Sequence, residues 1–520
     1  MIELELKFDL EPQAHAAFRR LPALADAPAR TVRLQATYFD TPGFELRERQ
    51  MALRLRRAGR RWYQTLKAGR SGAAGLHARD EWEFERAQPT LDLGLLDGTP
   101  FADIPEADRG IAEVFTVDVR RTTWEIEASP GNRVEIALDR GEVRHGERME
   151  PVSEVEIESV SGDPMAVFEV AERLIDAAPR AAGEAPAALR PSATTKAQRG
   201  YRLAREEAPQ PMRAVPAELD AGMTPAEAAR AIAAAALTQL QANEPGVLAG
   251  EEPEYLHQFR VALRRLRSAL GVFKSAAGPG NEALRDELRW IGGLTGPARD
   301  WDVFATSTLP TLLGAHGDAR VARSLRARAG ARRRAASNEL REALRSNRWT
   351  RLLLALARWL ATPAAQAEGA EPESLTDFAR SLVRKRHKRL VRDARRLSAL
   401  TPAERHALRL DAKRLRYALE GLSPLFRRKR VAAHLEALSE IQDDLGRAND
   451  AAVAARLLAE LRPPAGFSEF ARGWFAAQEH ASAAGVERHA GALADVPKLA
   501  LKGESRRRAA QEVPQPAEAA

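Results

Sequence analysis

The stretch Ile2-Glu3-Leu4-Glu5-Leu6-Lys7-Phe8 alternates apolar and charged residues without interruption. Successive side chains of a β-strand point to opposite faces, so this stretch predicts a strand with one apolar and one charged face. A second stretch of the same kind lies further along the chain, and its charged face is formed by Glu154, Glu156 and Glu158. Acidic strands therefore stand at both ends of one region, and this relationship decides how we expect the region to fold.

Strands of the same alternating kind fill the sequence between these two stretches. Turn signals such as Asp40-Thr41-Pro42-Gly43 separate them, and helical patterns near residues 13–20 and 165–177 interrupt them. The expected strands are Ile2 to Phe8, Val32 to Phe39, Met51 to Arg57, Trp62 to Lys67, Asp80 to Glu85, Phe115 to Glu127, Arg133 to Asp139 and Ser153 to Ser159. We therefore expect residues 1–203 to form an α+β domain, an eight-stranded antiparallel β-barrel or tunnel with flanking helices.

Charged residues line one face of most of these strands. On any single strand this is the ordinary solvated face of an antiparallel sheet. The signs, however, are segregated, because acidic residues lie on the first and last strands while Arg54, Arg56 and Lys67 lie on the middle strands. If the apolar faces pack outward under the helices, both sets line one interior, where charges must be paired, hydrated or bound to ions.

An interior of this composition suits phosphate chemistry. The chain contains no cysteine, so a metal ion must be held by oxygen or histidine ligands. Clustered carboxylates favour a hard divalent cation, Mg²⁺ or Mn²⁺. Arginine and lysine on the opposing wall favour phosphate oxygens. The sequence therefore predicts metal-assisted phosphoryl chemistry in a polar cavity.

Composition limits the class of protein. At 520 residues the chain is too long for one ordinary core. Hydrophobic residues make up 44% and charged residues 29%, which is typical of soluble globular proteins. Apolar stretches such as Leu352 to Leu360 are too short to span a bilayer. The first residues enter a strand pattern directly, without the features of a signal peptide, so we expect a cytoplasmic enzyme.

The rest of the chain is helical in pattern and rich in Ala, Leu, Arg and Glu. A proline-bearing linker is expected at 204–222 and an all-α domain at 223–500. A break near 362–372 divides this domain into two repeats, about 223–361 and 373–500. The polar stretch 501–520 is expected to be a disordered tail.

Two sets of basic residues relate the helical repeats. They share one helical spacing and are His257, Arg260, Arg264 and Arg267 in the first repeat, and His406, Arg409, Lys413 and Arg416 in the second. Acidic residues follow each set at nearly equal distance, at Asp300 and Asp450. We therefore expect two repeated helical bundles with a basic face that suits a polyanion, whether nucleic acid, phospholipid or polyphosphate. The alternative is a solvated helix face, which the net charge of +8 fits equally well.

A series of short motifs runs through the first 203 residues in a fixed order. It consists of Glu3-Leu-Glu5-Leu-Lys7, Tyr38-Phe-Asp40-Thr-Pro, Leu53-Arg54-Leu-Arg56, Thr65-Leu-Lys67, Arg79-Asp-Glu81, Glu135-Ile-Ala-Leu-Asp139, Glu154-Val-Glu156-Ile-Glu158 and Thr195-Lys196-Ala-Gln-Arg-Gly-Tyr201. The first motif is similar to the ExExK signature of the CYTH superfamily, the triphosphate tunnel metalloenzymes, and the whole series resembles that family. The duplicated basic helices resemble a CHAD domain, a helical partner of CYTH domains that is known as a polyphosphate binder.

The resemblance implies a role for each matching position. The metal-binding carboxylates are Glu3, Glu5, Asp139, Glu154, Glu156 and Glu158. The residues that hold the triphosphate are Lys7, Arg54, Arg56, Lys67, Arg121 and Lys196. The residues assigned to catalysis are Glu5, Lys7, Glu81 and Glu158. One departure is visible, because the family often has a second basic residue two positions after Arg121, where this chain has Thr123.

We therefore expect metal-dependent hydrolysis of inorganic triphosphate to diphosphate and phosphate. The same fold could instead hydrolyse thiamine triphosphate or a nucleoside triphosphate, although only Tyr38 and Tyr63 are candidates for an aromatic shelf. A different class is a non-catalytic polyphosphate-binding protein, against which the clustered glutamates argue. Specific nucleic-acid binding through the arginine-rich helices lacks the interleaved aromatic residues typical of single-strand binders. The pattern does not predict an oligomeric state.

Overall fold

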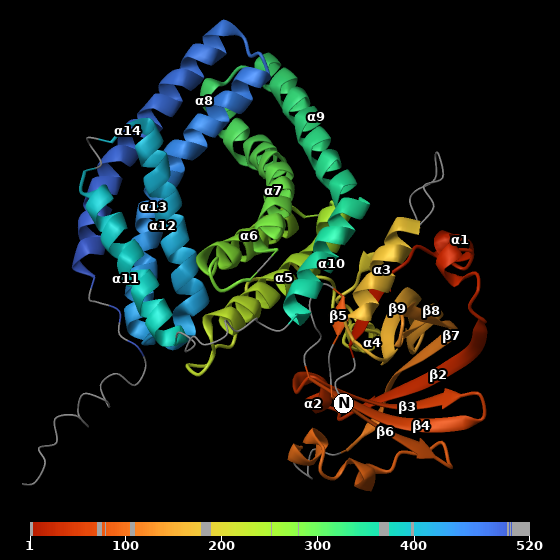
Figure 1. Ribbon diagram of the computed structural model, residues 1–520. Coiled ribbons are helices and arrows are strands. Elements are labelled where there is room, and N and C mark those ends of the chain that lie inside the picture. The colour runs from red at the N-terminus through yellow and green to blue at the C-terminus, as the bar shows by residue number, and fades with distance from the viewer. Residues whose placement is uncertain are drawn as a thin grey trace, which may run out of the picture. The chain divides into compact units, whose positions relative to one another are not determined.

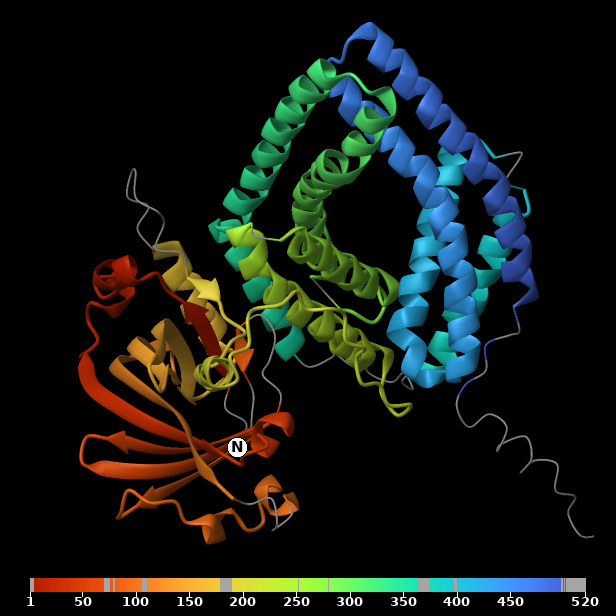
Figure 2. The same cartoon turned by 180° about the vertical axis from the view of Figure 1, so that it is seen from behind.

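The computed structural model divides into two compact units. One unit contains Met1–Met212 and Glu342–Pro363, and the other contains Arg213–Arg341 and Ala364–Ala520. Strands dominate the first unit and helices form the second (Figures 1 and 2). The residues that the structure describes are 4–69, 75–77, 80–104, 110–177, 189–250, 252–278, 280–362, 374–396, 400–496, 499 and 501.

A single antiparallel sheet builds the first unit. Its strands follow the order β10-β1-β9-β8-β7-β2-β3-β4-β6, and β5 pairs with β1. Eight of the strands are long: β1 (Glu5–Asp9), β2 (Arg30–Asp40), β3 (Met51–Ala58), β4 (Arg61–Ala68), β6 (Asp80–Arg86), β7 (Ala112–Ser129), β8 (Asn132–His145) and β9 (Arg148–Ser161). The predicted eight-stranded fold is therefore confirmed, with the two-residue strands β5 (Leu76–His77) and β10 (Arg190–Pro191) added to it.

The sheet curves strongly, and the chain itself links its two edges (Figure 1). Strand β5 pairs with β1 near one edge of the sheet, whereas β6 follows it closely in sequence and pairs with β4 at the other edge. Lys7 N also donates a hydrogen bond to Gly75 O, at 2.8 Å. These connections bring the acidic first strand and the basic middle strands around one interior, as expected for a tunnel.

The apolar faces of β1 and β9 point away from this interior. Leu6, Val155 and Ile157 are completely buried, and helix α3 (Ala166–Ala177) contacts the strands that carry them. Its own buried face includes Phe168 and Leu174. Full burial of one such side chain stabilises a fold by roughly 1.5–3 kcal/mol. The expectation that apolar faces pack under helices and charged faces line the inside is thus confirmed for β1 and β9, but it is wrong for β2 and β7, whose apolar residues Leu34, Ala36, Val117 and Val119 line the cavity.

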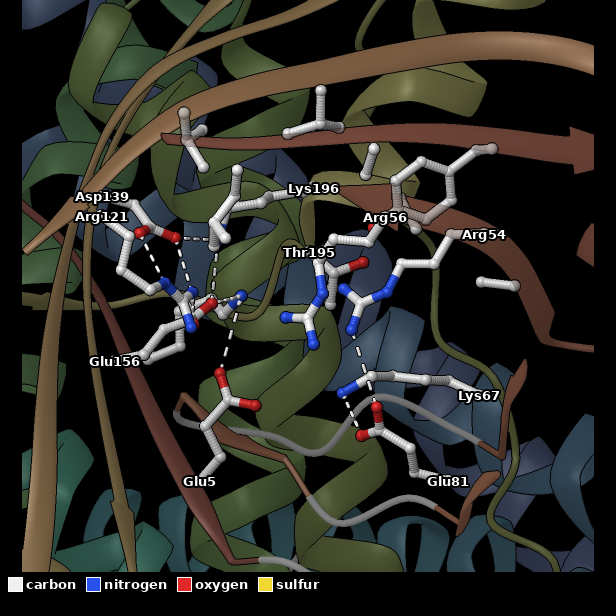
Figure 3. Close-up of a pocket in the computed structure, with 18 of the residues that line it drawn as sticks. Glu5, Arg54, Arg56, Lys67, Glu81, Arg121, Asp139, Glu156, Thr195 and Lys196 are labelled. Carbon is white, nitrogen blue, oxygen red and sulfur yellow. Dashed lines mark hydrogen bonds and ion pairs between the residues drawn. The ribbon is translucent and has the colours of Figure 1, made fainter. Parts of the chain in front are cut away.

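Helix α4 (Lys196–Ala204) fills part of the concave side. It begins with a capping box in which Thr195 accepts a hydrogen bond from Gln198 N. Tyr201 packs edge-on against Phe115, at 5.1 Å between ring centroids. Gly200 lies so close to the Phe115 ring that a Cβ built on it would be 2.1 Å from a ring carbon. The side chain that begins this helix, Lys196, points into the tunnel (Figure 3).

Helix α10 (Asn347–Ala361) belongs to the first unit, although the sequence pattern places it in the first helical repeat. It contacts α3 and β10. Its sequence is helical and apolar on one face, so its secondary structure follows from the pattern. The helical period does not predict the elements against which this apolar face packs.

Nine α-helices make up the second unit among its described residues. These are α5 (Pro225–Ala249), α6 (Pro253–Val272), α7 (Asn281–Val303), α8 (Leu309–His316), α9 (Ala319–Leu344), α11 (Leu375–Ala394), α12 (Pro402–Leu422), α13 (Arg428–Glu460) and α14 (Ala465–Asp495). The last residues of α9 fall on the other side of the boundary, in the first unit. Capping boxes at Thr224 and Thr401 begin α5 and α12. Helix α6 contacts α12 and α7 contacts α13, so equivalent helices of the two repeats face each other. Among the residues described, no helix is long and apolar enough to cross a membrane.

Candidate active site

A cavity of about 260 Å³ occupies the interior of the curved sheet (Figure 3). Among the described residues, six acidic and six basic side chains line it: Glu5, Glu81, Glu83, Asp139, Glu156, Glu158, Lys7, Arg54, Arg56, Lys67, Arg121 and Lys196. Buried Glu154 adds a further carboxylate behind this lining. The first, last and middle strands therefore meet in one site, as the segregated charges predict.

Lysine and carboxylate groups interleave on the acidic side. Lys196 Nζ lies 2.6 Å from Asp139 Oδ2 and 2.9 Å from Glu156 Oε1, and it also contacts Glu154. Lys7 Nζ lies 2.6 Å from Glu156 Oε1 and 3.2 Å from Glu154 Oε1. Burial alone would lower the pKa of Lys7, but Glu154 and Glu156 raise it above its ordinary value. Both lysines are therefore held as ammonium groups.

Arg121 binds Asp139, one of the two fully buried carboxylates of the site. Its Nε and Nη2 donate to the two oxygens of Asp139 at 2.8 and 2.7 Å, and its Nη2 also contacts Glu156. Asp139 has no exposed surface. Burial opposes its ionisation, but Lys196 and Arg121 hold its pKa below the ordinary value. This bidentate pair fixes the guanidinium group at the edge of the cavity.

A second wall is predominantly basic. Lys67 Nζ and Arg54 Nη2 lie 2.5 and 3.6 Å from the oxygens of Glu81. Arg56 Nη2 donates to Glu83 Oε2 at 2.9 Å. Burial and the neighbouring Arg54 lower the pKa of Arg56. Three cations share two carboxylates here, so this wall retains the capacity to bind an anion.

Glu5 and Glu158 occupy directly opposite positions on β1 and β9. Glu5 Oε1 is buried and accepts no hydrogen bond among the described residues, although Lys7 Nζ lies 3.7 Å away. Burial and the nearby Glu156 raise the pKa of Glu5. An unsatisfied buried carboxylate oxygen is costly unless a cation approaches it.

These observations test whether the residues fit a divalent cation. Asp139, Glu154 and Glu156 offer oxygens within 4.8 Å of one another. Lys7, Arg121 and Lys196 already neutralise that group, however, so the chemistry favours the adjacent Glu5 and Glu158, with Glu156 shared between these two carboxylates and the three cations. Glu5, Glu156 and Glu158 all line the cavity, and Glu5 has an oxygen in need of a cation. The donor set therefore fits a hard metal ion at the Glu5 end of the cavity. Glu3 lies outside the described residues.

Sequence reasoning missed several residues of the site. Glu83 lines the cavity and accepts hydrogen bonds from Arg56 and Thr65, whereas Glu135, which lies opposite Glu158 in the ladder between β8 and β9, is not among the described lining residues. Strand alternation places both glutamates on charged faces but does not single out Glu83 as a residue of the site. Apolar residues of β2 and β7 also line the cavity, namely Leu34, Ala36, Val117 and Val119.

A second cluster of charges lies in the helical unit. Arg260 and Arg264 on α6 lie near Arg409 and Lys413 on α12. Burial, Arg409 and Arg264 lower the pKa of Lys413 to about 8. Arg409 Nη1 donates to Asn449 Oδ1 at 2.7 Å, whereas the buried Nε atoms of Arg264 and Arg409 have no hydrogen-bond acceptor among the described residues. The structure thus brings the central members of both predicted basic sets together.

The outer members of the two sets have other surroundings. Burial and the like charges of Arg289 and Arg285 lower the pKa of Arg267. Arg416 Nε lies 2.7 Å from Glu420 Oε1 and forms an ion pair with it. Burial and Arg299 lower the pKa of His257, which favours a neutral imidazole. The side chain of His406 lies outside the described residues.

Comparison with known proteins assigns both regions. Residues 1–201 match the CYTH domain family, and residues 231–459 match the CHAD domain family. An inorganic triphosphatase of Haemophilus influenzae is 31% identical over 176 residues, which cover 33% of this chain and 49% of that protein. The chain therefore spans about half the length of this curated relative.

Two further similarities extend over the helical region. An uncharacterized protein of Mycobacterium tuberculosis is 29% identical over 454 residues, which cover 80% of this chain and 81% of that protein. The crystal structure of the CHAD domain from the plant Ricinus communis is 37% identical, covers 56% of this chain and 99% of that chain, and superposes with a TM-score of 0.50. The chain is therefore a member of the CYTH family in its first part and of the CHAD family in its second.

Proposed function

We propose that this chain hydrolyses inorganic triphosphate to diphosphate and phosphate in the charged tunnel, with the help of a divalent cation. The observation that carries the proposal is the cavity itself, in which an acidic wall with an unsatisfied oxygen at Glu5 faces the basic wall of Arg54, Arg56 and Lys67. The similarity to an inorganic triphosphatase supports the same reaction.

The charge of the lining explains why a cation is needed. Acidic and basic side chains are equal in number among the described lining residues, and Glu154 adds one more negative charge. A fully ionised triphosphate therefore enters a site with no net positive charge of its own. Cations that arrive with it must supply the missing compensation.

The side chains have distinct proposed tasks. Arg54, Arg56 and Lys67 bind and orient one part of the phosphate chain from their wall, while Lys7, Arg121 and Lys196 neutralise it from the other. Glu81 holds Lys67 in place through its 2.5 Å contact. Water attacks the terminal phosphorus, the bond to the bridging oxygen breaks, and Glu158 orients that water.

Glu5, Glu156 and Glu158, with Glu3, would hold Mg²⁺ or Mn²⁺, and the deeper Asp139 and Glu154 would set the charge behind them. When bound, the ion supplies Lewis acidity and neutralises charge that develops on the phosphate oxygens. The chain's own contribution is a set of charged donors that are already held in place by ion pairs before the substrate binds.

One observation favours an organic triphosphate as the second candidate. Leu34, Ala36, Val117 and Val119 give the cavity an apolar strip on β2 and β7. Such a strip could contact the organic part of thiamine triphosphate or a nucleoside triphosphate. No aromatic residue other than Tyr38 is among the described lining residues, which favours the inorganic substrate.

Phosphate release by the full chain from tripolyphosphate, thiamine triphosphate and ATP, each with Mg²⁺ and with Mn²⁺, tests these alternatives. We expect tripolyphosphate to have the highest kcat/KM and EDTA to abolish release. Faster hydrolysis of an organic triphosphate would establish the second candidate. Metal-independent binding without phosphate release would instead identify a non-catalytic polyphosphate-binding protein.

We further propose that the cluster of Arg260, Arg264, Arg409 and Lys413 binds polyphosphate. Two repeats contribute to it, and buried guanidinium nitrogens there lack acceptors among the described residues. Such a site should bind long polyphosphate with strong salt dependence. The test is binding by full-length protein with Arg264→Ala and Arg409→Ala together, measured at two salt concentrations. Unchanged affinity, or affinity insensitive to salt, would refute the assignment.

A further inference from the structure

Helix α10 lies within the residues that match the CHAD family, yet it packs in the tunnel unit (Figure 1). Its polar contacts there come from successive turns of the helix. Asn347 Nδ2 donates to Ile175 O at 3.3 Å, and Thr350 Oγ1 donates to Leu189 O at 3.0 Å. Arg351 pairs with Asp176, and Arg358 Nη1 lies 3.4 Å from Glu172 Oε1. The helix is therefore fastened to α3 and to the residue before β10.

The hydrogen bond from Thr350 is the most protected of these contacts. Thr350 and Leu189 are each 2% exposed. Arg351 and Asp176, by contrast, are half-exposed at the rim of the contact. A buried carbonyl that loses its donor is left without a replacement from water, so this bond carries more weight than the exposed ion pairs.

The residues after Leu189 lead directly into the proposed active site. Arg190 and Pro191 form β10, which pairs with Asp9 and Phe8 of β1. Ser192 N then donates to Lys7 O at 2.9 Å. The segment ends at Thr195, the N-cap of α4, whose first residue Lys196 reaches into the tunnel.

We propose that α10 is a positioning element of the tunnel and that Thr350 is its positioning residue. By fixing Leu189, it holds residues 189–196 against β1 and so places Lys7 and Lys196 among their carboxylates. None of the four α10 side chains named above is among the described residues that line the cavity. A helix that belongs to the CHAD match by sequence therefore supports the tunnel, which belongs to the CYTH match.

The structural consequence can be tested independently of activity. In full-length Thr350→Val, we expect amide hydrogen exchange at residues 189–196 and in β1 to accelerate about tenfold, which corresponds to about 1.4 kcal/mol. Thr350→Ser retains the hydroxyl group and should restore slow exchange. Thr362→Val is the matched control, because the Thr362 hydroxyl donates to Arg358 O within its own helix, at 2.8 Å. Unchanged exchange in Thr350→Val would overturn the proposal.

Docking can also be trapped chemically, since the chain contains no native cysteine. Asp176→Cys combined with Arg351→Cys should be joined within one chain by a short bis-maleimide reagent and identified by mass spectrometry. If both single variants react with a monofunctional maleimide but the pair is not joined, α10 does not dock there and the proposal fails.

A kinetic test of the same proposal rests on the proposed function. Misplaced lysines should raise KM for tripolyphosphate at least about fivefold in Thr350→Val, whereas a smaller folded fraction alone would lower apparent kcat and leave KM unchanged. An unchanged KM despite faster exchange would overturn the positioning role. If wild-type protein released no phosphate, the proposed function would fail while the exchange and cross-linking results still decided whether α10 supports β10.

Discussion

Glu5 on β1 lies directly opposite Glu158 on β9, and both line the tunnel cavity. Like charges at opposite positions of an antiparallel pair repel. Glu135 stands opposite Glu158 on its other side, so three carboxylates form a row across β1, β9 and β8. A divalent cation bound at the Glu5 end would reverse this repulsion into attraction.

Glu5→Gln should therefore separate stability from activity. We expect the variant to be as stable as wild-type protein or more stable in EDTA, to lose most of the rise in Tm that Mg²⁺ or Mn²⁺ produces, and to turn over tripolyphosphate roughly 100-fold more slowly or worse. Thermal unfolding with and without metal, combined with phosphate release, measures these effects.

Glu169→Gln is the control for this substitution, because Glu169 is an exposed residue of α3. It should retain the metal-dependent shift in Tm and full turnover. A Glu5→Gln variant that behaved in the same way would remove Glu5 from the metal site.

The contact between Arg121 and Asp139 should be essential for stability as well as for activity. Arg121→Met removes the bidentate partner of the fully buried Asp139 and leaves Lys196 as its remaining cation, so the free energy of unfolding should fall by at most roughly 3–5 kcal/mol. Arg33→Met is a stringent control, since Arg33 also binds an aspartate, Asp118, through two nitrogens but is largely exposed. Its loss should change the free energy of unfolding far less, because solvent screens an exposed ion pair.

A double variant then distinguishes the two roles of Arg121. Adding Asp139→Asn to Arg121→Met removes the buried charge that Lys196 alone would then have to neutralise, and it should recover part of the stability, because the partners are coupled. Turnover should not recover, since a cation that neutralises the substrate is still missing. Denaturant unfolding and steady-state kinetics on the same samples provide both readings, and recovery of turnover would show that Arg121 serves only the fold.

Much of the site could be predicted from the sequence, because side chains of a strand alternate between two faces with a strict and local period of two. This alternation places Glu5, Lys7, Glu156 and Glu158 on one face regardless of what lies across the sheet. The ion-pair partners could not be predicted in this way, because Lys196 and Asp139 come into contact only when the whole tunnel domain has folded. Propensity likewise predicts α10 as a helix, but its contact with Leu189 depends on tertiary packing that no local pattern describes.

Gly200 should be sensitive to the smallest possible enlargement. A Cβ at this position would overlap the ring of Phe115, so Gly200→Ala must displace α4 or the ring and should cost about 1–3 kcal/mol. Because Lys196 belongs to the same helix, KM for tripolyphosphate should rise as well. Gly473→Ala is the control, since Gly473 lies in α14 with open space around it, and alanine there should be neutral or stabilising. A neutral Gly200→Ala in both assays would show that α4 can shift without disturbing the site.

Lys413 should make polyphosphate binding depend on pH in the mildly alkaline range. Burial and the cations Arg409 and Arg264 lower its pKa to about 8, so the free protein loses this charge as pH rises through that value. A bound polyanion favours the ammonium form, and binding should therefore take up protons and weaken between about pH 7 and about pH 9.

Lys413→Arg tests this linkage, because arginine remains charged throughout that range. Binding of long polyphosphate to the full chain should lose most of its pH dependence in the variant, while affinity near pH 7 stays close to that of wild type. Lysine titration also predicts an opposite trend for folding: the pKa is lower in the folded than in the unfolded protein, so its contribution to stability becomes more favourable as pH rises above about 8. If wild type and Lys413→Arg showed the same decline in affinity, Lys413 would not be part of the polyanion site.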